Sequence, residues 1–324
     1  MSDTPIGFDP DLPLTGSMEE DWSSECNEVV VEVLARFNVI FVAYPLHAAF
    51  HSRCDFLMKL GRSTQGGPQK GLRVLAPTGS GKTRAAEEFI RMVVERRGGG
   101  GDTFPVVLVP LDRATTSRKL FSSILTYFGD EFTRSATEAI LKERAYTYLR
   151  RFRTELLMID EVQHLTSAGS GGDVTDSLKR LLDDGVVPVV FLGTLEAMNL
   201  FTANLQLAGR LLPPCDYRML SKDSAADREL LTRFADELDL AIVREGLMQR
   251  PAGFSHPWIS GCLHEVSAGV IGRISRIVYV ALEIACRRGA DCIEVFDLAL
   301  AVDRWALEQG FTERNPFRSS RPEL

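Results

Sequence analysis

The sequence lacks several features that would assign it to a specialised class of protein. No apolar run approaches the length of a membrane span, and none of the six cysteines forms a C-x-x-C pair. We therefore expect reduced thiols and a cytoplasmic protein. No lysine or arginine precedes Arg36, and such an acidic start is the opposite of a secretory or transit signal. His47, His51 and Cys54 share a helical spacing but lack a fourth ligand, so we assign no metal other than nucleotide-bound magnesium.

The chain also lacks an excess of positive charge. Its formal net charge is −7 over 324 residues, of which 45% are hydrophobic and 25% are charged. These values are typical of an ordinary globular protein with one large or two medium domains. They exclude a globally basic nucleic-acid binder, but they leave room for a local basic surface.

What the sequence does contain is a phosphate-binding loop. Residues 76–83 read APTGSGKT and lie between a short apolar run and an amphipathic segment, which is the strand–loop–helix context of a P-loop. Ala76 stands where the usual pattern has glycine, and its methyl group is tolerable if φ is negative. Backbone N–H groups of such a loop surround the phosphates, and the helix N-terminus adds partial positive charge. The expected nucleotide-binding residues are Thr78, Gly79, Ser80, Gly81, Lys82 and Thr83.

Two of these residues have a specific chemical expectation. Lys82 is expected to reach the β- and γ-phosphates, and the Thr83 hydroxyl to bind magnesium. The alternative is a glycine-rich turn with an incidental lysine.

A second motif points to hydrolysis rather than binding alone. The apolar run at 156–159 is typical of a strand buried on both faces of a parallel sheet, and it ends in Asp160 and Glu161. We expect Asp160 to hold the magnesium shell and Glu161 to polarise the attacking water. An Asp-Glu pair after an apolar run is in general commonplace, so the interpretation depends on the P-loop upstream.

Five segments of different character follow one another along the chain. Residues 1–25 are acidic and contain proline and glycine, so we expect a flexible N-terminal segment. Residues 26–70 are expected to form helices and a linker, and 71–220 the nucleotide-binding core. A small all-helical lid domain is expected at 221–311 and a basic flexible tail at 312–324.

The core alternates apolar runs with helical patterns, which indicates an α/β doubly wound fold with a five-stranded parallel sheet. Ligands of such sheets bind at the carboxyl ends of the strands, so the two motifs should meet there. The expected strands lie at 72–75, 105–109, 156–159, 185–192 and 215–220.

This layout resembles that of AAA+ ATPases, which implies further functional residues. Residues 189–194 resemble the sensor 1 strand, with Thr194 as the polar residue near the γ-phosphate or the water. Residues 206–210 resemble the segment that carries an arginine finger, here Arg210, for a neighbouring subunit's nucleotide. In the lid, Arg273 matches sensor 2, with Arg276 as the alternative register. Each arginine could instead be an ordinary solvated residue.

More specifically, the chain is similar to the TniB/TnsC family of transposon-encoded AAA+ regulators, from about residue 40 to about residue 310. The stretch after sensor 1 is more discriminating than the two nucleotide-binding motifs, which occur in many families. The resemblance rests on residues 40–45, 76–83, 157–165, 187–197 and 206–210.

The resemblance implies a nucleotide-gated switch. Members of the family assemble with ATP into rings or helical filaments on duplex DNA, mark a target site, receive a TniQ-type target selector and recruit a DDE transposase. Hydrolysis disassembles the filament. For this chain the resemblance implies ATP and Mg²⁺ as cofactors, binding to double-stranded DNA largely without sequence preference, a homo-oligomer in the bacterial cytosol, and no membrane partner.

A candidate DNA-contact surface follows the second expected strand. Its cations and hydroxyls suit contacts to phosphates without base readout. The alternative is a solvated helix start with Thr116 or Ser117 as N-cap. A second basic run, at 142–153, is better explained as a structural helix with a solvated face. The candidate contact residues are Arg113, Thr115, Thr116, Arg118 and Lys119.

Two other functions compete with a transposition regulator. A helicase loader or replication-initiation ATPase would more often carry a DNA-reading domain, and no convincing helix-turn-helix follows Ser221. A signalling or defence scaffold would use ATP only to hold a conformation, and the intact Asp160-Glu161 pair argues against it.

Overall fold

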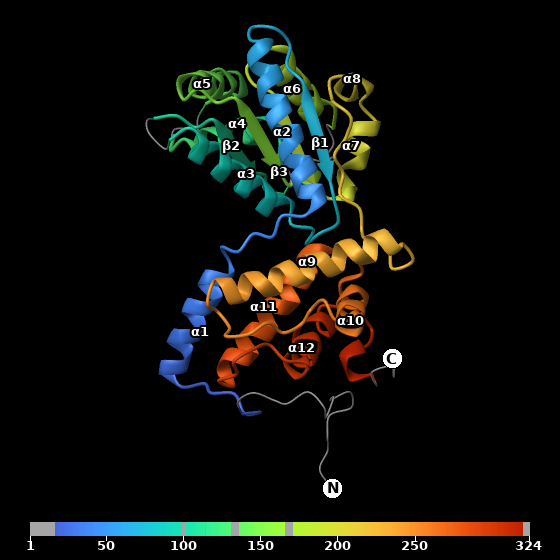
Figure 1. The fold of residues 1–324 in the computed structure, drawn as a ribbon. Coiled ribbons are helices and arrows are strands. Elements are labelled where there is room, and N and C mark those ends of the chain that lie inside the picture. The colour runs from blue at the N-terminus through green and yellow to red at the C-terminus, as the bar shows by residue number, and fades with distance from the viewer. Residues whose placement is uncertain (1–16, 99–101, 114, 131–135, 166–170, 320–324) are drawn as a thin grey trace. The chain divides into compact units, whose positions relative to one another are not determined.

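The computed structural model describes residues 17–98, 102–113, 115–130, 136–165 and 171–319. The chain divides into two compact units (Figure 1). The sheet unit is Pro45–Tyr217, and the helical unit combines Met1–Tyr44 with Arg218–Leu324. Residues 26–70, which the sequence groups as one segment, are therefore shared between the two units. The sheet unit is an insertion within the helical unit.

The sheet unit is built on four parallel strands in the order β1-β4-β3-β2. Every residue of β3 and β4 is buried, as their continuous apolar runs predict. The register pairs Leu75 with Gly193 and Pro110 with Asp160, so the carboxyl ends of all four strands meet at one edge. The strands are β1 (Gly71–Leu75), β2 (Val106–Pro110), β3 (Leu156–Asp160) and β4 (Val189–Gly193).

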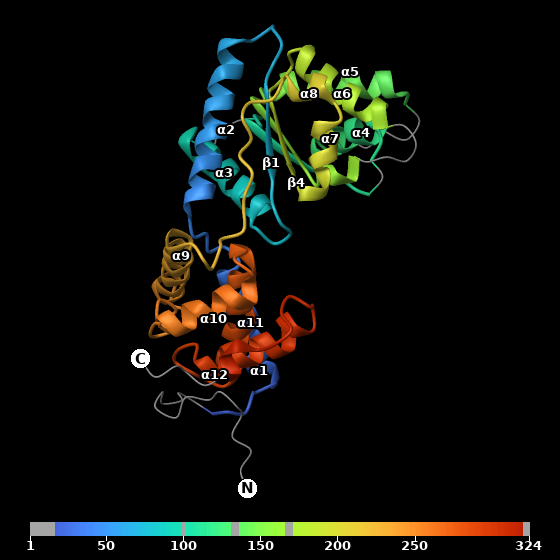
Figure 2. The ribbon, with the colours of Figure 1, turned by 90° about the vertical axis from the view of Figure 1, so that its right-hand side faces the viewer.

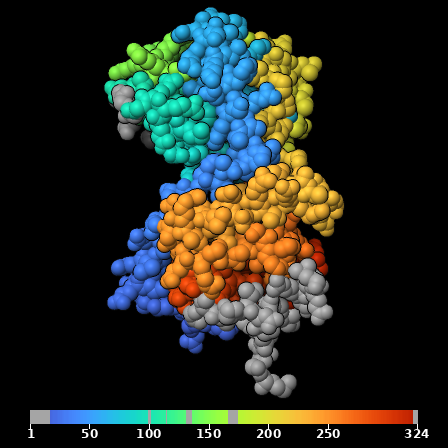
Figure 3. Space-filling view, in the orientation of Figure 1, coloured from blue at the N-terminus to red at the C-terminus, as the bar shows by residue number. Residues whose placement is uncertain are grey.

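Helices cover both faces of this sheet (Figure 2). α2 (Pro45–Ser63) and α3 (Lys82–Arg96) lie on one face, and their side chains cover most of that side of the unit (Figure 3). The helices on the other face pack into one core with alternate strand residues such as Phe191. These are α4 (Ser117–Tyr127), α5 (Glu138–Arg151), α6 (Gly171–Asp183), α7 (Met198–Thr202) and α8 (Leu205–Ala208).

The α/β class and the parallel sheet are confirmed, but the expected fifth strand at 215–220 is not formed. The chain does run beside β1, where the amides of Leu212, Cys215 and Tyr217 donate to carbonyls of β1 at 2.7–2.9 Å. Pro213 and Pro214 interrupt this ladder because proline has no N–H to donate. The result is a single bridge rather than a strand, and the described residues form four strands.

The helical unit packs α1 (Ser24–Phe37) against the C-terminal helices, and Phe37 meets Tyr279 edge-on at 5.8 Å. The apolar spacing of these helices predicts their buried faces. The remaining helices are α9 (Ala225–Arg244), α10 (Pro257–Ser267), α11 (Ile271–Arg287) and α12 (Val295–Ala301), followed by the short turns Val302–Leu307 and Pro316–Arg318.

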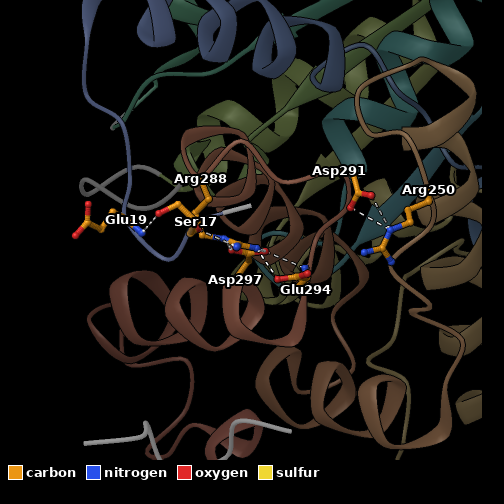
Figure 4. Close-up of polar contacts among 7 residues, drawn as sticks. All are labelled: Ser17, Glu19, Arg250, Arg288, Asp291, Glu294 and Asp297. Atoms are coloured by element: carbon orange, nitrogen blue, oxygen red, sulfur yellow. Dashed lines mark hydrogen bonds and ion pairs between the residues drawn. The ribbon is translucent and has the colours of Figure 1, made fainter. Parts of the chain in front are cut away.

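A buried ion network joins the end of α11 to the start of α12 (Figure 4). Arg288 donates to both carboxylate oxygens of Asp297 at 2.8 and 2.9 Å and to Glu294 at 2.7 Å. The side chains of Arg288 and Asp297 are both 0% exposed. Arg288 also donates to the carbonyl of Ser17 at 3.1 Å, which ties the N-terminal segment to this network.

Both segments that the sequence predicts to be flexible have ordered parts. The Arg287 guanidinium lies 3.7 Å from the ring centre of Trp22. Near the other end, Phe317 is fully buried and Arg318 pairs with Asp303 at 2.5 Å. Residues 17–25 and 312–319 are thus held in the helical unit by contacts that composition alone does not indicate. Residues 1–16 and 320–324 lie outside the described part of the chain.

Candidate active site

The P-loop connects β1 to α3. Gly79 and Gly81 have φ angles of 78° and 83°, in the left-handed region that favours glycine. Ala76 is absent from the residues with positive φ, so its methyl group is accommodated as the sequence predicts. Its amide donates to the Gly193 carbonyl at 3.1 Å, which anchors the start of the loop to β4. The loop therefore has the backbone form that surrounds phosphates.

The lysine of the loop is buried and lies near two carboxylates. Lys82 is 7% exposed, and its Nζ donates to the Ala76 carbonyl at 3.4 Å. Burial lowers the pKa of Lys82, and the charges of Asp160 and Glu161 oppose that shift. A buried cation at this position has a strong electrostatic preference for an anionic ligand.

The threonine of the loop is hydrogen-bonded to the end of β3. The Thr83 hydroxyl donates to Asp160 at 2.6 Å, and Asp160 is 2% exposed. The other Asp160 oxygen accepts the amide of Glu161 at 2.8 Å. Glu161 has φ of 59°, an uncommon conformation for a residue with a side chain, and such backbone strain is concentrated at functional sites.

A glutamine in the turn after β3 (Val162–Leu165) joins two of these groups. Gln163 donates from its amide nitrogen to the Glu161 carboxylate and accepts the amide of Thr194 at 3.0 Å. Sequence reasoning missed Gln163 because no motif marks a glutamine two residues after an acidic pair. Its position in the turn beside β4 is a consequence of the fold.

The residues fit magnesium and a nucleotide triphosphate. The hydroxyl oxygens of Ser80 and Thr194 are buried without a hydrogen-bond partner, and such orphaned groups call for a polar ligand. The Thr83 hydroxyl and the Asp160 carboxylate are oxygen donors of the kind that Mg²⁺ prefers. The helix dipole of α3 and Lys82 would face the phosphates.

The structure does not bring Arg210 into this group. Its guanidinium donates to Asp183 at 2.8 Å, and its carbonyl accepts the amide of Gly71. Gly71 begins β1, whereas the P-loop follows the end of β1, so Arg210 lies at the opposite end of that strand. Any contact to a nucleotide phosphate would have to be with another copy of the chain.

The two sensor 2 candidates belong to the helical unit. The Arg273 guanidinium lies 4.4 Å from the ring centre of Phe311, and its Nε is buried without a partner. Burial lowers the pKa of Arg273. Arg276 is exposed and lies over Tyr279 at 4.7 Å. Within the described residues, Arg273 is therefore the candidate with an unsatisfied donor.

The candidate DNA-contact residues are divided between the surface and the interior. Arg113, Arg118 and Lys119 are exposed. Thr116 caps α4, accepting the amide of Lys119 at 3.4 Å, as the alternative interpretation predicts. Thr115 is only 4% exposed and donates its hydroxyl to the carbonyl of Asp112, so it shapes the loop rather than presenting a donor.

This surface segment is connected to the turn that carries Gln163. The amide of Thr115 donates to the carbonyl of His164 at 3.0 Å. The two segments are far apart in sequence, and this bond places them side by side at the ends of β2 and β3.

None of the described helices is long and apolar enough to cross a membrane. Across the same ranges, no three histidine, cysteine or acidic side chains gather in a way that could hold a metal ion. His51, one of the spaced residues, instead donates to the carbonyl of Ala85 at 2.8 Å.

Comparison with solved structures gives the fold. The ORC1 protein of Aeropyrum pernix in complex with DNA has a TM-score of 0.58 at 17% identity, covering 84% of this chain and 68% of that chain. The ORC2 protein of Aeropyrum pernix, in ADPNP–ADP complexes, has a TM-score of 0.55 at 16% identity, covering 78% and 67%. Domain III of the Thermotoga maritima replication initiation protein DnaA has a TM-score of 0.51 at 15% identity, covering 82% and 95%.

Comparison of sequences gives the family. No curated protein matches the chain. The family model described as "Bacterial TniB protein" matches residues 41–215, which is more than half of the chain and includes the P-loop, Asp160, Glu161 and Thr194. The chain therefore belongs to the TniB family, and its fold is similar to those of the ORC and DnaA proteins.

Proposed function

We propose that this protein is an ATP-dependent regulator of DNA transposition that hydrolyses ATP with magnesium. The observation that carries the ATPase part is the convergence of Lys82, Thr83, Asp160 and Glu161 at the carboxyl ends of β1 and β3. Membership of the TniB family supports the role in transposition.

Each residue of the site has a distinct role in the proposed hydrolysis. Thr83 and Asp160 would hold the magnesium, which would supply charge neutralisation at the phosphate oxygens. Lys82 binds the β- and γ-phosphates, because a buried ammonium group is poorly hydrated and needs an anionic partner. Glu161 accepts a proton from the attacking water, and the orphaned Thr194 hydroxyl contacts that water or the γ-phosphate.

Two arginines complete the proposed site from elsewhere. We assign Arg210 to the nucleotide of a neighbouring copy, since its position at the far end of β1 leaves only that arrangement. Its pairing with Asp183 would hold the guanidinium in place before assembly. We assign Arg273 as sensor 2 because it has a buried Nε without a partner. Planar guanidinium groups suit phosphate oxygens at both positions.

The proposed DNA contact is made by Arg113, Arg118 and Lys119, with Thr116 at the helix start. Lys119 lines a hollow of about 480 Å³ whose wall also carries hydroxyls of Ser122, Ser123 and Thr126. Cations and hydroxyls of this kind contact phosphates without reading bases. The structural similarity to an ORC1 protein solved with DNA supports this proposal.

We further propose that the protein acts as an oligomer in the bacterial cytosol. With ATP it would assemble as a ring or filament on double-stranded DNA, receive a TniQ-type selector and recruit a DDE transposase. Hydrolysis would drive disassembly. The acidic overall charge of −7 is compatible with this, because an assembly can have a basic lining and an acidic exterior.

The first test is fluorescence anisotropy of a labelled random-sequence duplex titrated with protein in an ATP analogue, in ADP and without nucleotide. We expect cooperative, salt-sensitive binding with the ATP analogue only. Absence of binding in all three conditions would contradict the DNA-assembly function and favour a signalling scaffold. Binding that requires a replicative helicase would favour the helicase-loader alternative.

The second test is Glu161→Gln, which keeps the shape of the side chain and removes its basicity. We expect ATP to bind with unchanged affinity, hydrolysis to fall by about 10²-fold or more, and the DNA-bound assembly to persist. Glu143→Gln on the exposed side of α5 is the matched control. Normal turnover in Glu161→Gln would remove the assigned general base.

A further inference from the structure

Gln163 is the one described side chain that hydrogen-bonds both to Glu161 and to the main chain of Thr194. It is 8% exposed, so its amide lies in the interior rather than in solvent. Its nitrogen donates to the Glu161 carboxylate, and its oxygen accepts the Thr194 amide at 3.0 Å. The two residues come from different strands, β3 and β4, and this single side chain spans them.

A glutamine side chain satisfies both contacts at once, because its amide nitrogen donates and its amide oxygen accepts. A carboxylate at this position would have no proton to donate to Glu161 without being protonated, and a lysine or arginine would have no acceptor for the Thr194 amide. Alanine would leave the Thr194 amide without its partner, which is costly for a buried donor. The glutamine is therefore specified by the chemistry of both neighbours.

The end of β4 is shaped to admit this amide. A Cβ atom on Gly193 would lie 2.9 Å from the Gln163 oxygen and 2.7 Å from a methyl carbon of Val162. Both distances are shorter than normal contacts, so a side chain at 193 would displace the turn. The absence of a side chain at Gly193, next to Thr194, is a second and independent observation that the turn is fitted closely against this strand end.

The Glu161 side chain needs such an anchor. It is 42% exposed and sits on a backbone with φ of 59°. An exposed carboxylate with no fixed partner samples several rotamers, whereas a general base must be held within hydrogen-bond reach of its water. Thr194, the other group proposed to contact the water, is fixed by the same amide.

We propose that Gln163 is a positioning residue that sets the Glu161 carboxylate relative to Thr194 for hydrolysis. The proposal rests on the proposed ATPase function. Gln163 acts through its two neighbours rather than on the substrate. Its removal should therefore lower the rate of the chemical step while leaving nucleotide binding intact.

The first variant is Gln163→Ala, measured by steady-state ATP hydrolysis and by binding of a fluorescent ATP analogue. We expect kcat to fall by about tenfold or more, since a misplaced general base loses much of its contribution, and the Kd for nucleotide to stay within about twofold. Gln69→Ala is the matched control: Gln69 is another buried glutamine of the sheet unit, 3% exposed, whose amide donates to the carbonyls of Thr64 and Gly67. We expect Gln69→Ala to leave kcat unchanged.

The second variant is Gln163→Glu, which keeps the shape and guards against loss of folding. It places a second carboxylate against Glu161, and two adjacent carboxylates share a proton. Other charged groups near Glu161 are Asp160, Lys82 and His164, whose Nε2 lies 3.9 Å away. These are the same in both proteins. The ionised carboxylate that replaces the amide cannot donate to Glu161, so kcat should fall as it does in Gln163→Ala.

The outcomes separate this proposal from the function on which it rests. If wild-type protein hydrolyses ATP but Gln163→Ala has kcat within twofold of it, the positioning role is wrong and the ATPase stands. A wild-type kcat in Gln163→Glu would also overturn the role. If wild-type protein does not hydrolyse ATP, or Glu161→Gln turns over normally, the proposed function fails and this inference fails with it.

Discussion

Replacing Asp297 by alanine should destabilise the helical unit far more than removing an exposed ion pair. Asp297 is fully buried, binds Arg288 through both oxygens and accepts the amide of Glu294 at 2.8 Å. The variant leaves Arg288, whose side chain is also 0% exposed, without its main partner. Breaking a buried pair in this way costs about 3–5 kcal/mol, because the buried Arg288 keeps its charge but loses the Asp297 carboxylate, and Glu294 offsets that charge only in part.

The matched control is Asp291→Ala, which removes the neighbouring pair between Asp291 and Arg250 (Figure 4). Those side chains are 35% and 44% exposed, and solvent screens their attraction. We expect a loss of about 0–1 kcal/mol. The two variants remove the same chemical group from the same unit, so burial is the main difference between them.

Urea unfolding followed by tryptophan fluorescence measures both variants. All three tryptophans, Trp22, Trp258 and Trp305, lie in the helical unit, so the signal reports on that unit alone. With a slope of about 2 kcal/mol per M urea, the Asp297→Ala midpoint should fall by roughly 1.5–2.5 M. A shift within about 0.5 M of that of Asp291→Ala would refute the assignment of a large stabilisation to the buried Arg288–Asp297 pair.

Three further predictions concern the surface, pH and a glycine. The double variant Arg118→Ala with Lys119→Ala should weaken duplex binding equally for all DNA sequences. In anisotropy titrations, the slope of log K against log salt concentration should become shallower by about 2 units. An unchanged slope would mean that neither residue contacts DNA phosphates. Burial lowers the pKa of His51, whose ring donates to the carbonyl of Ala85. The contribution of the neutral His51 ring to the free energy of unfolding is complete above the unfolded pKa of about 6.5 and decreases as pH falls below it. The difference in melting temperature between about pH 7 and pH 5 should therefore be smaller in His51→Gln than in the wild-type protein. Gly269→Ala should destabilise the helical unit by about 2 kcal/mol or more, because φ is 72° and the new Cβ would lie 2.0 Å from a main-chain oxygen. Urea unfolding followed by tryptophan fluorescence measures this, and an unchanged midpoint would contradict the prediction.

The grouping of Lys82, Thr83 and Asp160 was predictable from the sequence because each motif is local. A P-loop must follow a strand, and an acidic pair after a continuous apolar run marks the end of a second strand. The carboxyl ends of parallel strands share an edge, so topology alone brings the two motifs together. The bond between Thr83 and Asp160 follows from that.

The parts that could not be predicted depend on contacts between distant segments. The apolar residues near Cys215 favoured a fifth strand, but Pro213 and Pro214 cannot donate to the hydrogen-bond ladder beside β1. Which ladder positions they occupy depends on the register with β1, and the local sequence does not give that register. The burial of Thr115 depends on its bond to His164, more than 40 residues later in the chain. Gln163 has its role only because β4 ends beside the turn, and no local pattern encodes that neighbour.

The insertion of one unit within the other has a consequence for the order in which the protein folds during synthesis. α1 leaves the ribosome early, yet Phe37 packs on Tyr279 of α11, roughly 240 residues later. At about 5–20 residues per second, the apolar face of α1 waits roughly 10–50 s for its partner, during which the whole sheet unit is made. The helix also carries Glu25, Glu28 and Glu32, and we expect their negative charge to favour the solubility of the waiting helix. Nascent chains halted before α11 should therefore already bind nucleotide, while α1 is still accessible to proteases.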